Sequence, residues 1–340
     1  MAADPQLLSD PGAVLERYHF YHAEAYILKG ELKQPVERPI EEYGRVVLQH
    51  TRREGLFTQS VGETNIEGLI SFKRGHTRVA GALVKQKTDL FGNDHAGWVT
   101  LSSAALEGYN VEDIVTADRV VAQLSTQHPM VKGHVPRVNF LGTRFENLRI
   151  GGYPVEVELD LAFCGAKPEG DRPYLLDGGF LDRVHRQLDN IVETDDLPES
   201  LEKKYCAEIA YIDDLKQRAK DGAKIGANSG ANGGENGYPK LRCSLVKKIK
   251  LPVEIPGVRT FGNAIFVRDF GTVYLGELEV GVNSGPSDHP DHPHWKGDGS
   301  QPQLSDSNYF KLNMLDMQLG CPSTGQTSGA GVTGNGQTKP

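Results

Sequence analysis

Apolar and acidic side chains alternate strictly over residues 153–161, and this pattern constrains the fold more than any other feature of the chain. Val155, Val157 and Leu159 would point to one side of a strand, and the carboxylates between them to the other. Segments rich in Val, Ile, Tyr and Thr, separated by Gly, Pro and Asn, fill the region from residue 18 to residue 161. Because such segments are typical of strands joined by turns, this half of the chain predicts β-sheet structure with half-buried strands.

A short phrase recurs three times at nearly constant spacing in the same region. Each copy has an apolar residue, a Glu, a turn-tolerant residue and a second apolar residue: Ile66-Glu67-Gly68-Leu69, Leu106-Glu107-Gly108-Tyr109 and Phe145-Glu146-Asn147-Leu148. Repetition at a fixed period indicates repeated structural units. We therefore expect quasi-repeats within residues 18–177, with Leu106 and Phe145 at equivalent positions of two units. The alternative is that strand-turn-strand segments resemble one another in composition alone.

The hydrophobic pattern changes at Gly178. Apolar residues then recur at intervals of three or four, which is the period of a helix with one buried face. The first predicted helix carries Phe180, Leu181, Val184, Leu188 and Ile191, and the second, which starts near Pro198, carries Leu201, Tyr205, Ile209, Ile212 and Leu215. Residues 178–220 are thus predicted to form an α-helical hairpin inserted between two β halves. Such a hairpin could cap an open end of the β-structure or bind a partner.

The remaining segments complete the predicted organisation. Residues 1–17 form an N-terminal arm, residues 221–237 a loop rich in Gly and Asn, and residues 238–320 a second β region. Residues 321–340 are rich in Gly, Ser and Thr and contain almost no core-forming side chains, which predicts a flexible tail. The expected fold class is mainly β, a sandwich or solenoid-like body with the helical hairpin inserted.

Charge and hydropathy limit the classes of function. The formal net charge is −8 and the isoelectric point is about 5.8, so the chain lacks the basic surface that a nucleic-acid-binding protein needs. No stretch of about 18 apolar residues is present, and the N-terminus has neither a basic start nor an apolar run. We therefore expect no transmembrane segment and no signal peptide, and a chain that is cytoplasmic or exported without a cleaved signal.

Four cysteines are spread widely along the sequence: Cys164, Cys206, Cys243 and Cys321. No Cys-x-x-Cys pair occurs, which excludes a zinc ribbon and a thioredoxin-type redox motif. The spacing fits ordinary reduced thiols and also fits up to two disulfide bridges.

The best cluster of metal-ligand residue types consists of Asp288, His289, Asp291, His292 and His294. Imidazole and carboxylate groups are ligands for Zn, Ni or Cu, so these five residues are the candidate metal site of the chain. The alternative is an exposed loop that binds such metals weakly, because it lacks fixed geometry and outer partners. No other cofactor is expected.

Catalytic templates are absent from the sequence. It contains no Gly-x-Ser-x-Gly elbow, no Walker loop, no Gly-x-Gly-x-x-Gly turn in a strand-to-helix context and no His-Glu-x-x-His. Glu156, Glu158 and Asp160 form a row on one strand face, whereas a glycosidase pair comes from separate strands. His19 and His22 are interpreted as structural. The sequence assigns no catalytic residue and favours a protein that is not an enzyme.

One family resemblance rests on several of these segments. An alternating strand at residues 99–108 leads to Thr116-Ala117-Asp118 and a second strand, and residues 145–155 and 312–320 contain further strands. These segments resemble the bacterial choice-of-anchor P proteins over about half of the chain. The resemblance implies a β-rich, surface-associated protein with no established catalytic site. The chain departs from that family by lacking an export signal and by carrying the helical insertion.

Two classes of function fit these features. The first is a structural or assembly protein, surface-associated in the manner that the resemblance implies, which forms a homo-oligomer through its β-rich surfaces. The second is a ligand-binding or metal-binding β-domain that uses carboxylates and histidines of its loops. This second class includes enzymes. A large ordered oligomer in solution would favour the first class, and a monomer with a deep polar pocket would favour the second.

Overall fold

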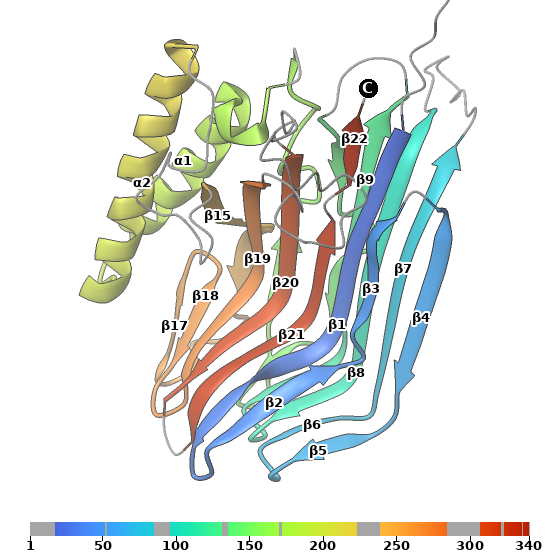
Figure 1. The fold of residues 1–340 in the computed structure, drawn as a ribbon. Coiled ribbons are helices and arrows are strands. Elements are labelled where there is room, and N and C mark those ends of the chain that lie inside the picture. The colour runs from blue at the N-terminus through green and yellow to red at the C-terminus, as the bar shows by residue number, and fades with distance from the viewer. Residues whose placement is uncertain are drawn as a thin grey trace, which may run out of the picture.

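The computed structural model describes most of the chain and shows a mainly β fold (Figure 1). Two helices form one pair inserted between strands, so the predicted fold class and the predicted helical hairpin are confirmed. The predicted arm at residues 1–17 and nearly all of the predicted loop at residues 221–237 lie outside the described residues. The described residues are 18–51, 53–84, 96–130, 135–169, 172–222, 239–283, 307–320, 323–334 and 336–339.

One ten-stranded sheet, here called sheet 1, is built from both ends of the described chain. Its strands follow the order β17-β18-β19-β20-β21-β1-β2, with β15 beside β19 and with β3 and β22 beside β1. The long strands β1 and β21, one from each end of the sequence, pair antiparallel at its centre. The strands are β1 (Tyr18–Gln34), β2 (Arg38–Tyr43), β3 (Val46–Thr51), β15 (Lys240–Ser244), β17 (Val258–Phe261), β18 (Ala264–Val267), β19 (Gly271–Asn283), β20 (Ser307–Leu319), β21 (Thr324–Gly334) and β22 (Gln337–Lys339).

A second ten-stranded sheet, sheet 2, is continuous in sequence. Its strands follow the order β13-β12-β9-β8-β6-β5, with β7 beside β8, β4 beside β7, and β10 and β11 beside β9. The antiparallel pair β8 and β9 forms its long central hairpin. The strands are β4 (Gly55–Val61), β5 (Thr64–Ile66), β6 (Ile70–Phe72), β7 (Arg74–Val84), β8 (Gly97–Val111), β9 (Val115–Pro129), β10 (Arg137–Asn139), β11 (Arg144–Glu146), β12 (Arg149–Ile150) and β13 (Tyr153–Pro154).

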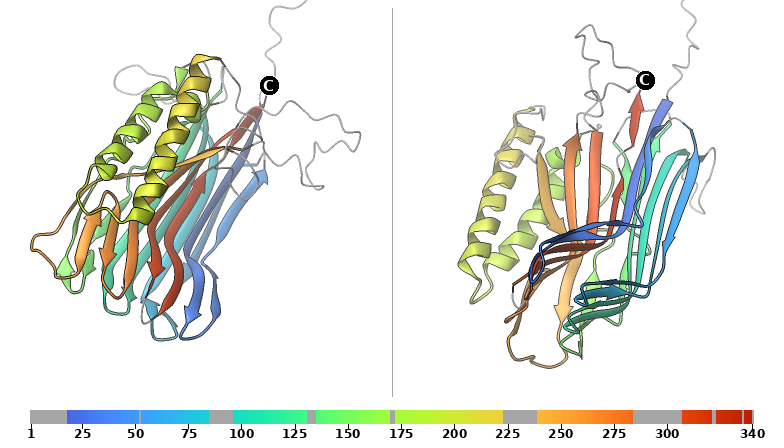
Figure 2. Two further views of the ribbon diagram at one scale, coloured as in Figure 1. Left: turned by 90° about the vertical axis from the view of Figure 1, so that its left-hand side faces the viewer. Right: turned by 60° about the horizontal axis from the view of Figure 1, so that its bottom comes forward.

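The two sheets pack face to face as a sandwich, and the helices lie on the far side of sheet 1 (Figure 2). The inner faces share one hydrophobic core. Ile27 of β1 lies so close to β7 that a Cβ on Gly75 would be 2.7 Å from it, and Gly329 of β21 faces Leu106 of β8. Ile27 and Leu106 are fully buried, and each side chain of this size stabilises the fold by roughly 1.5–3 kcal/mol through removal of apolar surface from water.

The central strands of sheet 1 are interrupted at one level, where the sheet bends (Figure 1). The ladder between β19 and β20 passes over Gly276 and Met314, and the ladders of β21 pass over Ala330. Gly276 and Ala330 have φ values of 55° and 49°, in the left-handed region. In sheet 2 the ladder of β8 likewise passes over Gly108, whose φ is 64°. Because Gly329 and Leu106 lie beside these points and face each other, the bends of the two sheets face one another.

The three copies of the recurring phrase are three different local structures. The first copy is the tight turn between β5 and β6, the second lies inside β8, and the third spans the break between β11 and β12. All three share a residue with positive φ, at Glu67, Gly108 and Asn147. The phrase therefore marks turns and bends of the chain. Leu106 and Phe145 are neighbours rather than equivalents, since they lie on opposite sides of Val120 in β9.

Strand β21 contradicts the predicted flexible tail at residues 321–340. It pairs with β1 on one side and with β20 on the other, and most of it is buried. Its residues are small because side chains of neighbouring strands occupy the space above them: a Cβ on Gly331 would be 2.1 Å from the ring of Tyr26. On the other face, a Cβ on Gly334 would be 3.0 Å from Leu124. The glycines that suggested disorder are the reason that this strand fits at the centre of sheet 1.

Helices α1 (Gly178–Val192) and α2 (Glu199–Lys220) cover sheet 1 beside β15 and β18 (Figure 1). The side chain of Asp177 caps α1 by accepting a hydrogen bond from the backbone N–H of Phe180 (2.7 Å). All five predicted apolar residues of α1 are buried. Ile191 lies against Gly262 in the turn between β17 and β18, and the Gln187 amide bonds the backbone N–H and C=O of Ser244 at 2.9 Å each. The hairpin therefore covers part of one face of sheet 1, whereas the capping prediction placed it at an open end of the β-structure.

The alternating segment forms β14 (Glu156–Leu159), which pairs with β16 (Val246–Lys250) in a separate two-stranded sheet. Val155 is buried, and Val157 and Leu159 are half-buried against the core, so the apolar side of the alternation faces inward as predicted. On the opposite side, Glu158 accepts a hydrogen bond from Lys247 (2.8 Å) at the surface. Such exposed pairs contribute little to stability.

Substitution of Gly331 tests the packing of β21. We expect Gly331→Ala to lower the free energy of unfolding by about 1–3 kcal/mol, because the new Cβ overlaps the Tyr26 ring within a sheet paired on both sides. Gly329→Ala is the matched control, since its Cβ would meet Leu106 at an ordinary 3.5 Å, and it should lose clearly less. Urea denaturation followed by circular dichroism measures both variants. Equal losses would contradict this account of β21.

Candidate ligand-binding groove

The outer face of sheet 1 carries polar side chains in rows that run across the strands. In the first row, Arg242 of β15, Glu279 of β19 and Lys311 of β20 lie at one level. In the second row, Glu277 of β19 lies opposite Asn313 of β20. Because side chains at one level of neighbouring strands are neighbours on the face of a sheet, these groups form a continuous polar surface.

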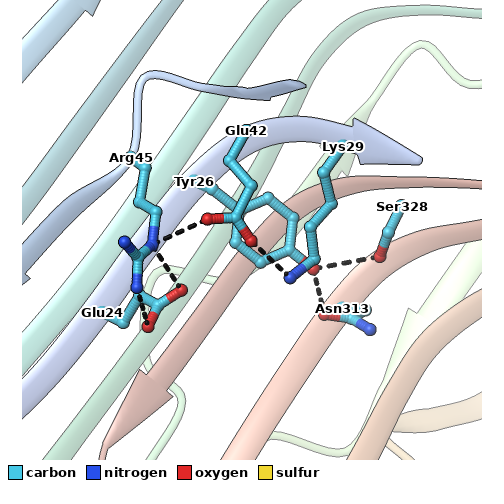
Figure 3. Close-up of polar contacts among 7 residues, drawn as sticks. All are labelled: Glu24, Tyr26, Lys29, Glu42, Arg45, Asn313 and Ser328. Atoms are coloured by element: carbon cyan, nitrogen blue, oxygen red, sulfur yellow. Dashed lines mark hydrogen bonds and ion pairs between the residues drawn. The ribbon is translucent and has the colours of Figure 1, made fainter. Parts of the chain in front are cut away.

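Tyr26 of β1 extends the second row across β21. Its ring lies over Gly331, and its hydroxyl donates to Oδ1 of Asn313 (2.8 Å) and lies 3.0 Å from Oγ of Ser328 (Figure 3). Burial raises the pKa of this phenol above its ordinary value, so the phenol stays protonated. Tyr26 therefore acts as a fixed donor that orients the Asn313 amide.

Charged side chains enclose Tyr26 in a network of their own (Figure 3). The Nζ of Lys29 lies 4.3 Å from the centroid of the Tyr26 ring and 3.0 Å from Oε1 of Glu42. The guanidinium of Arg45 lies 3.2 Å from Oε1 of Glu24 and 2.7 Å from Oε2 of Glu42. Two cations and two carboxylates therefore satisfy one another here.

A groove of about 210 Å³ opens on this face beside α2. Three cations and three carboxyl groups line it: Lys204 from α2, and Arg242, Glu277, Glu279, Lys311 and Asp316 from sheet 1. Pockets for drug-sized molecules occupy roughly 300–1,000 Å³. The size and the polar lining of the groove therefore suit a small polar molecule.

Glu277 is the unusual residue of the groove. Its half-buried carboxyl group accepts no hydrogen bond from any residue in the described part of the chain. Burial, and then the nearby carboxylate of Asp316, raise the pKa of Glu277, although Lys204 and Arg242 act in the opposite direction. A carboxyl group partly removed from water without a hydrogen-bond partner is unfavourable. The fold therefore holds Glu277 in the groove at some expense of stability.

Glu279, two residues further along β19, is satisfied by the protein. Its carboxylate accepts a hydrogen bond from the Tyr309 hydroxyl (2.8 Å) and lies 3.1 Å from Nζ of Lys240 and 3.5 Å from Nε of Arg242. Burial alone would raise the pKa of Glu279, but Lys240 and Tyr309 together lower it below its ordinary value. The two carboxyl groups of one strand thus differ in proton affinity, which is a property of many functional sites.

Two ammonium groups of the groove form no ion pair with any residue that the structure describes. Lys204 lies over aromatic rings, with Nζ 5.1 Å from the centroid of Tyr274 and 5.8 Å from that of Tyr205. Lys311 acts on Glu279 at longer range. Both charges are therefore available to a bound molecule.

A second hollow, of about 300 Å³, lies between α1 and β16. Two of its three cations are engaged, because Arg183 donates to the carbonyl oxygens of Phe163 (2.7 Å) and Cys164 (2.6 Å), and Lys247 contacts Glu158. The third, Arg186, acts on Asp182 and helps to lower the pKa of that carboxyl group. We interpret this hollow as structural, with Arg183 fastening the preceding loop to α1.

The predicted metal site lies outside the described residues. It consists of Asp288, His289, Asp291, His292 and His294. Among the residues with a described position, no group of three or more His, Cys, Asp or Glu side chains is arranged to hold a metal ion. The metal site therefore stays a prediction.

His19 packs inside the sandwich, as a structural role requires. The centroid of its ring lies 5.5 Å from that of Trp98 and 4.5 Å from that of His128. Burial, and then the neighbouring His128, lower the pKa of His19 to about 2, so its ring is neutral at physiological pH. Burial also lowers the pKa of His22.

The described cysteines are free thiols: Cys164, Cys206 and Cys243. Burial raises the pKa of Cys164 and Cys243 above the ordinary thiol value, so both remain protonated in the core. Cys321 lies outside the described residues.

No residue of the groove belongs to a site that the sequence predicts. Residues 272–280 read as a strand, and alternation predicts the face that Glu277 occupies but not the distant side chains that meet it there. Arg242 and Lys204 reach the groove through the pairing of β15 with β19 and the packing of α2, which no local pattern encodes. The one usable signal is the presence of two acidic residues, Glu277 and Glu279, in an otherwise apolar strand.

Substitution of Glu277 should stabilise the protein at neutral pH. A raised folded-state pKa stabilises the fold below the ordinary Glu value of 4.5, and this contribution is lost as pH rises through the folded-state value. The charged groups that face Glu277 are Asp316, Lys204, Arg242 and Glu279. At pH 7 we expect Glu277→Gln to be more stable than the wild type by roughly 0.5–2 kcal/mol, and the difference should vanish as pH falls below 4.5.

Glu279→Gln is the matched control, with the opposite sign. The lowered pKa of Glu279 means that its ionised form stabilises the fold above the ordinary Glu value and that this contribution is lost as pH falls through the folded-state value. Loss of its charged hydrogen bond should cost about 1.5–3 kcal/mol at pH 7. Urea denaturation between about pH 4 and pH 8 measures both variants. Changes of the same sign would show that the two environments are assigned wrongly.

No helix in the described part of the chain is long and apolar enough to span a membrane. No curated protein matches the chain, and no solved structure does. The resemblance to choice-of-anchor P proteins stays a prediction, together with the surface association that it implies. A family model described as a domain of unknown function, DUF8256, matches residues 19–281, from β1 through both helices to β19. Because this range is most of the chain, the protein belongs to the DUF8256 family.

Proposed function

We propose that the chain is a ligand-binding β-domain whose groove on sheet 1 takes a small polar molecule. The observation that carries this proposal is the Glu277 carboxyl group, which lines the groove and accepts no hydrogen bond from the described residues. Polar groups without protein partners in a concave site are typical of places where a ligand completes the hydrogen bonding. Lys204 and Lys311 support the proposal, because neither side chain forms an ion pair with any residue that the structure describes.

The charged cluster around Tyr26, on the same sheet, differs from the groove in how its charges are paired. Around Tyr26, Lys29 and Arg45 are paired with Glu24 and Glu42. The charged groups around Tyr26 are therefore satisfied by one another, whereas in the groove Glu277 accepts no hydrogen bond, and Lys204 and Lys311 form no ion pair, among the described residues. We propose ligand binding alone, because binding requires complementary groups on the protein but no catalytic group.

Titration with small molecules tests the proposal. A panel of amines, carboxylates, amino acids and sugars is added to the full-length 15N-labelled protein, and amide resonances are followed by NMR. We expect at least one class to shift the resonances of β19 and β20, and we expect these shifts to disappear in Glu277→Gln. Glu158→Gln, on the exposed face of β14, is the control and should bind as the wild type does. If no compound shifts these resonances, or if Glu277→Gln responds unchanged, the proposal is wrong.

A second candidate function is self-association through a sheet edge, favoured by strand β4. Within the described structure β4 pairs with β7 alone, and most of the strand is exposed. Leu56 and Phe57 are 58% and 51% exposed. Natural edge strands are normally protected by charges, proline or bulges, and β4 contains no charged residue and no proline. Its free edge is therefore suited to pair with a second copy of the chain, as a homo-oligomer formed through β-rich surfaces requires.

Substitution of Thr58 tests this association. Thr58 lies at the centre of β4, so two antiparallel copies would place their Thr58 residues together, and Glu there would repel its own copy. Within one chain the new Glu would face Arg78 of β7, which preserves the fold. We expect a concentration-dependent dimer for the wild type and a monomer for Thr58→Glu in analytical ultracentrifugation.

The control for this variant is Val253→Glu, which adds the same charge at an exposed site away from β4. It should associate as the wild type does. A wild type that stays monomeric at all concentrations, or two variants that behave alike, would exclude association through β4.

A further inference from the structure

The charges of the groove are ordered along its strands. At one end, Arg242 and Lys311 flank Glu279, so this end has an excess of positive charge. Glu277 lies two residues before Glu279 on β19. Asp316 lies on β20, beyond Asn313 on the side away from Lys311. Levels two residues apart on a strand are about 7 Å apart. The groove therefore has a positive end and an acidic end at the separation of a small molecule's two termini.

The acidic end has room for a cationic group. The carboxylate of Asp316 raises the pKa of Glu277 as a like charge, and Asp316 accepts a hydrogen bond from Asn313 (2.9 Å). A nearby like charge disfavours the ionised form of a carboxyl group, and a nearby cation favours it. Lys204 and Arg242 offset part of the charge of Glu277 at longer range, but neither forms an ion pair with Glu277 or Asp316 among the described residues. An ammonium group of a ligand would supply both the charge and three N–H donors.

The positive end suits a carboxylate. Glu279 is already held by Lys240 and by the Tyr309 hydroxyl. Lys311 and the outer side of Arg242, whose side chain is 46% exposed, are left to face the groove. Charge-assisted hydrogen bonds from such groups to a carboxylate are stronger than bonds between neutral groups.

We propose that the ligand of the groove is a zwitterion, bound with its ammonium group at Glu277 and Asp316 and its carboxylate at Lys311 and Arg242. This inference rests on the proposed function of the groove. The spacing of the two ends favours a molecule whose charges lie about 7 Å apart over one whose charges are adjacent.

A series of ω-amino acids tests the inference. Glycine, β-alanine, γ-aminobutyrate and 6-aminohexanoate carry the same two charges at rising separation, and butylamine and butyrate each carry one of them. Isothermal titration of the full-length wild type should give the tightest binding for one of the two longer amino acids. That probe should bind at least about tenfold more tightly than butylamine or butyrate, a difference of 1.4 kcal/mol. This comparison uses the wild type alone and does not depend on the folding of any variant.

Two variants assign the ends. Lys311→Gln should weaken binding of the best amino acid about tenfold and leave butylamine unchanged, whereas Glu277→Gln should weaken both. Glu158→Gln should weaken neither. If butylamine or butyrate binds as tightly as every amino acid, or if a sugar alone binds, the ligand is not a zwitterion while the proposed binding function stands. If nothing in the panel binds at the groove, both the inference and the proposed function are wrong.

Discussion

The packing of β21 between β1 and β20 is the constraint on which the rest of the structure depends. Its small residues let the Tyr26 ring lie over Gly331 on the outer face and let Leu106 reach Gly329 on the inner face. One strand thus brings the two sheets together and leaves room for a buried tyrosine above it. Because the Tyr26 hydroxyl then fixes Asn313, the same packing shapes the polar surface beside Glu277.

The groove joins parts of the chain that are far apart in sequence. Its floor is β19 and β20, and its side wall is α2, which contributes Lys204 from the inserted hairpin. The match to the DUF8256 family ends within β19, before β20 and β21. The structure shows that these two later strands complete sheet 1 and supply Lys311, Asn313 and Asp316 to the groove.

The sequence predicted local structure well and tertiary structure poorly. Hydrophobic periodicity depends on near neighbours alone. It predicts the mainly β class, the helical hairpin with the buried face of α1, and the inward side of Val155. Strand β21 could not be predicted, because a glycine-rich segment reads as disordered unless the side chain that fills the space above it is known. The groove could not be predicted, because it depends on strand order and register. The candidate metal site in the His-rich loop lies outside the described residues.

The position of the groove also decides what binding requires. Glu277, Glu279 and Asp316 stand on strands that are paired on both sides, so a ligand need not order their backbone. Such preorganisation lowers the entropic loss on binding. Lys204 is different, because it extends from a helix and holds its place through contact with the Tyr274 ring. Lys204 therefore supplies its charge to the groove from the helical hairpin, whereas the three carboxyl groups stand on paired strands of sheet 1.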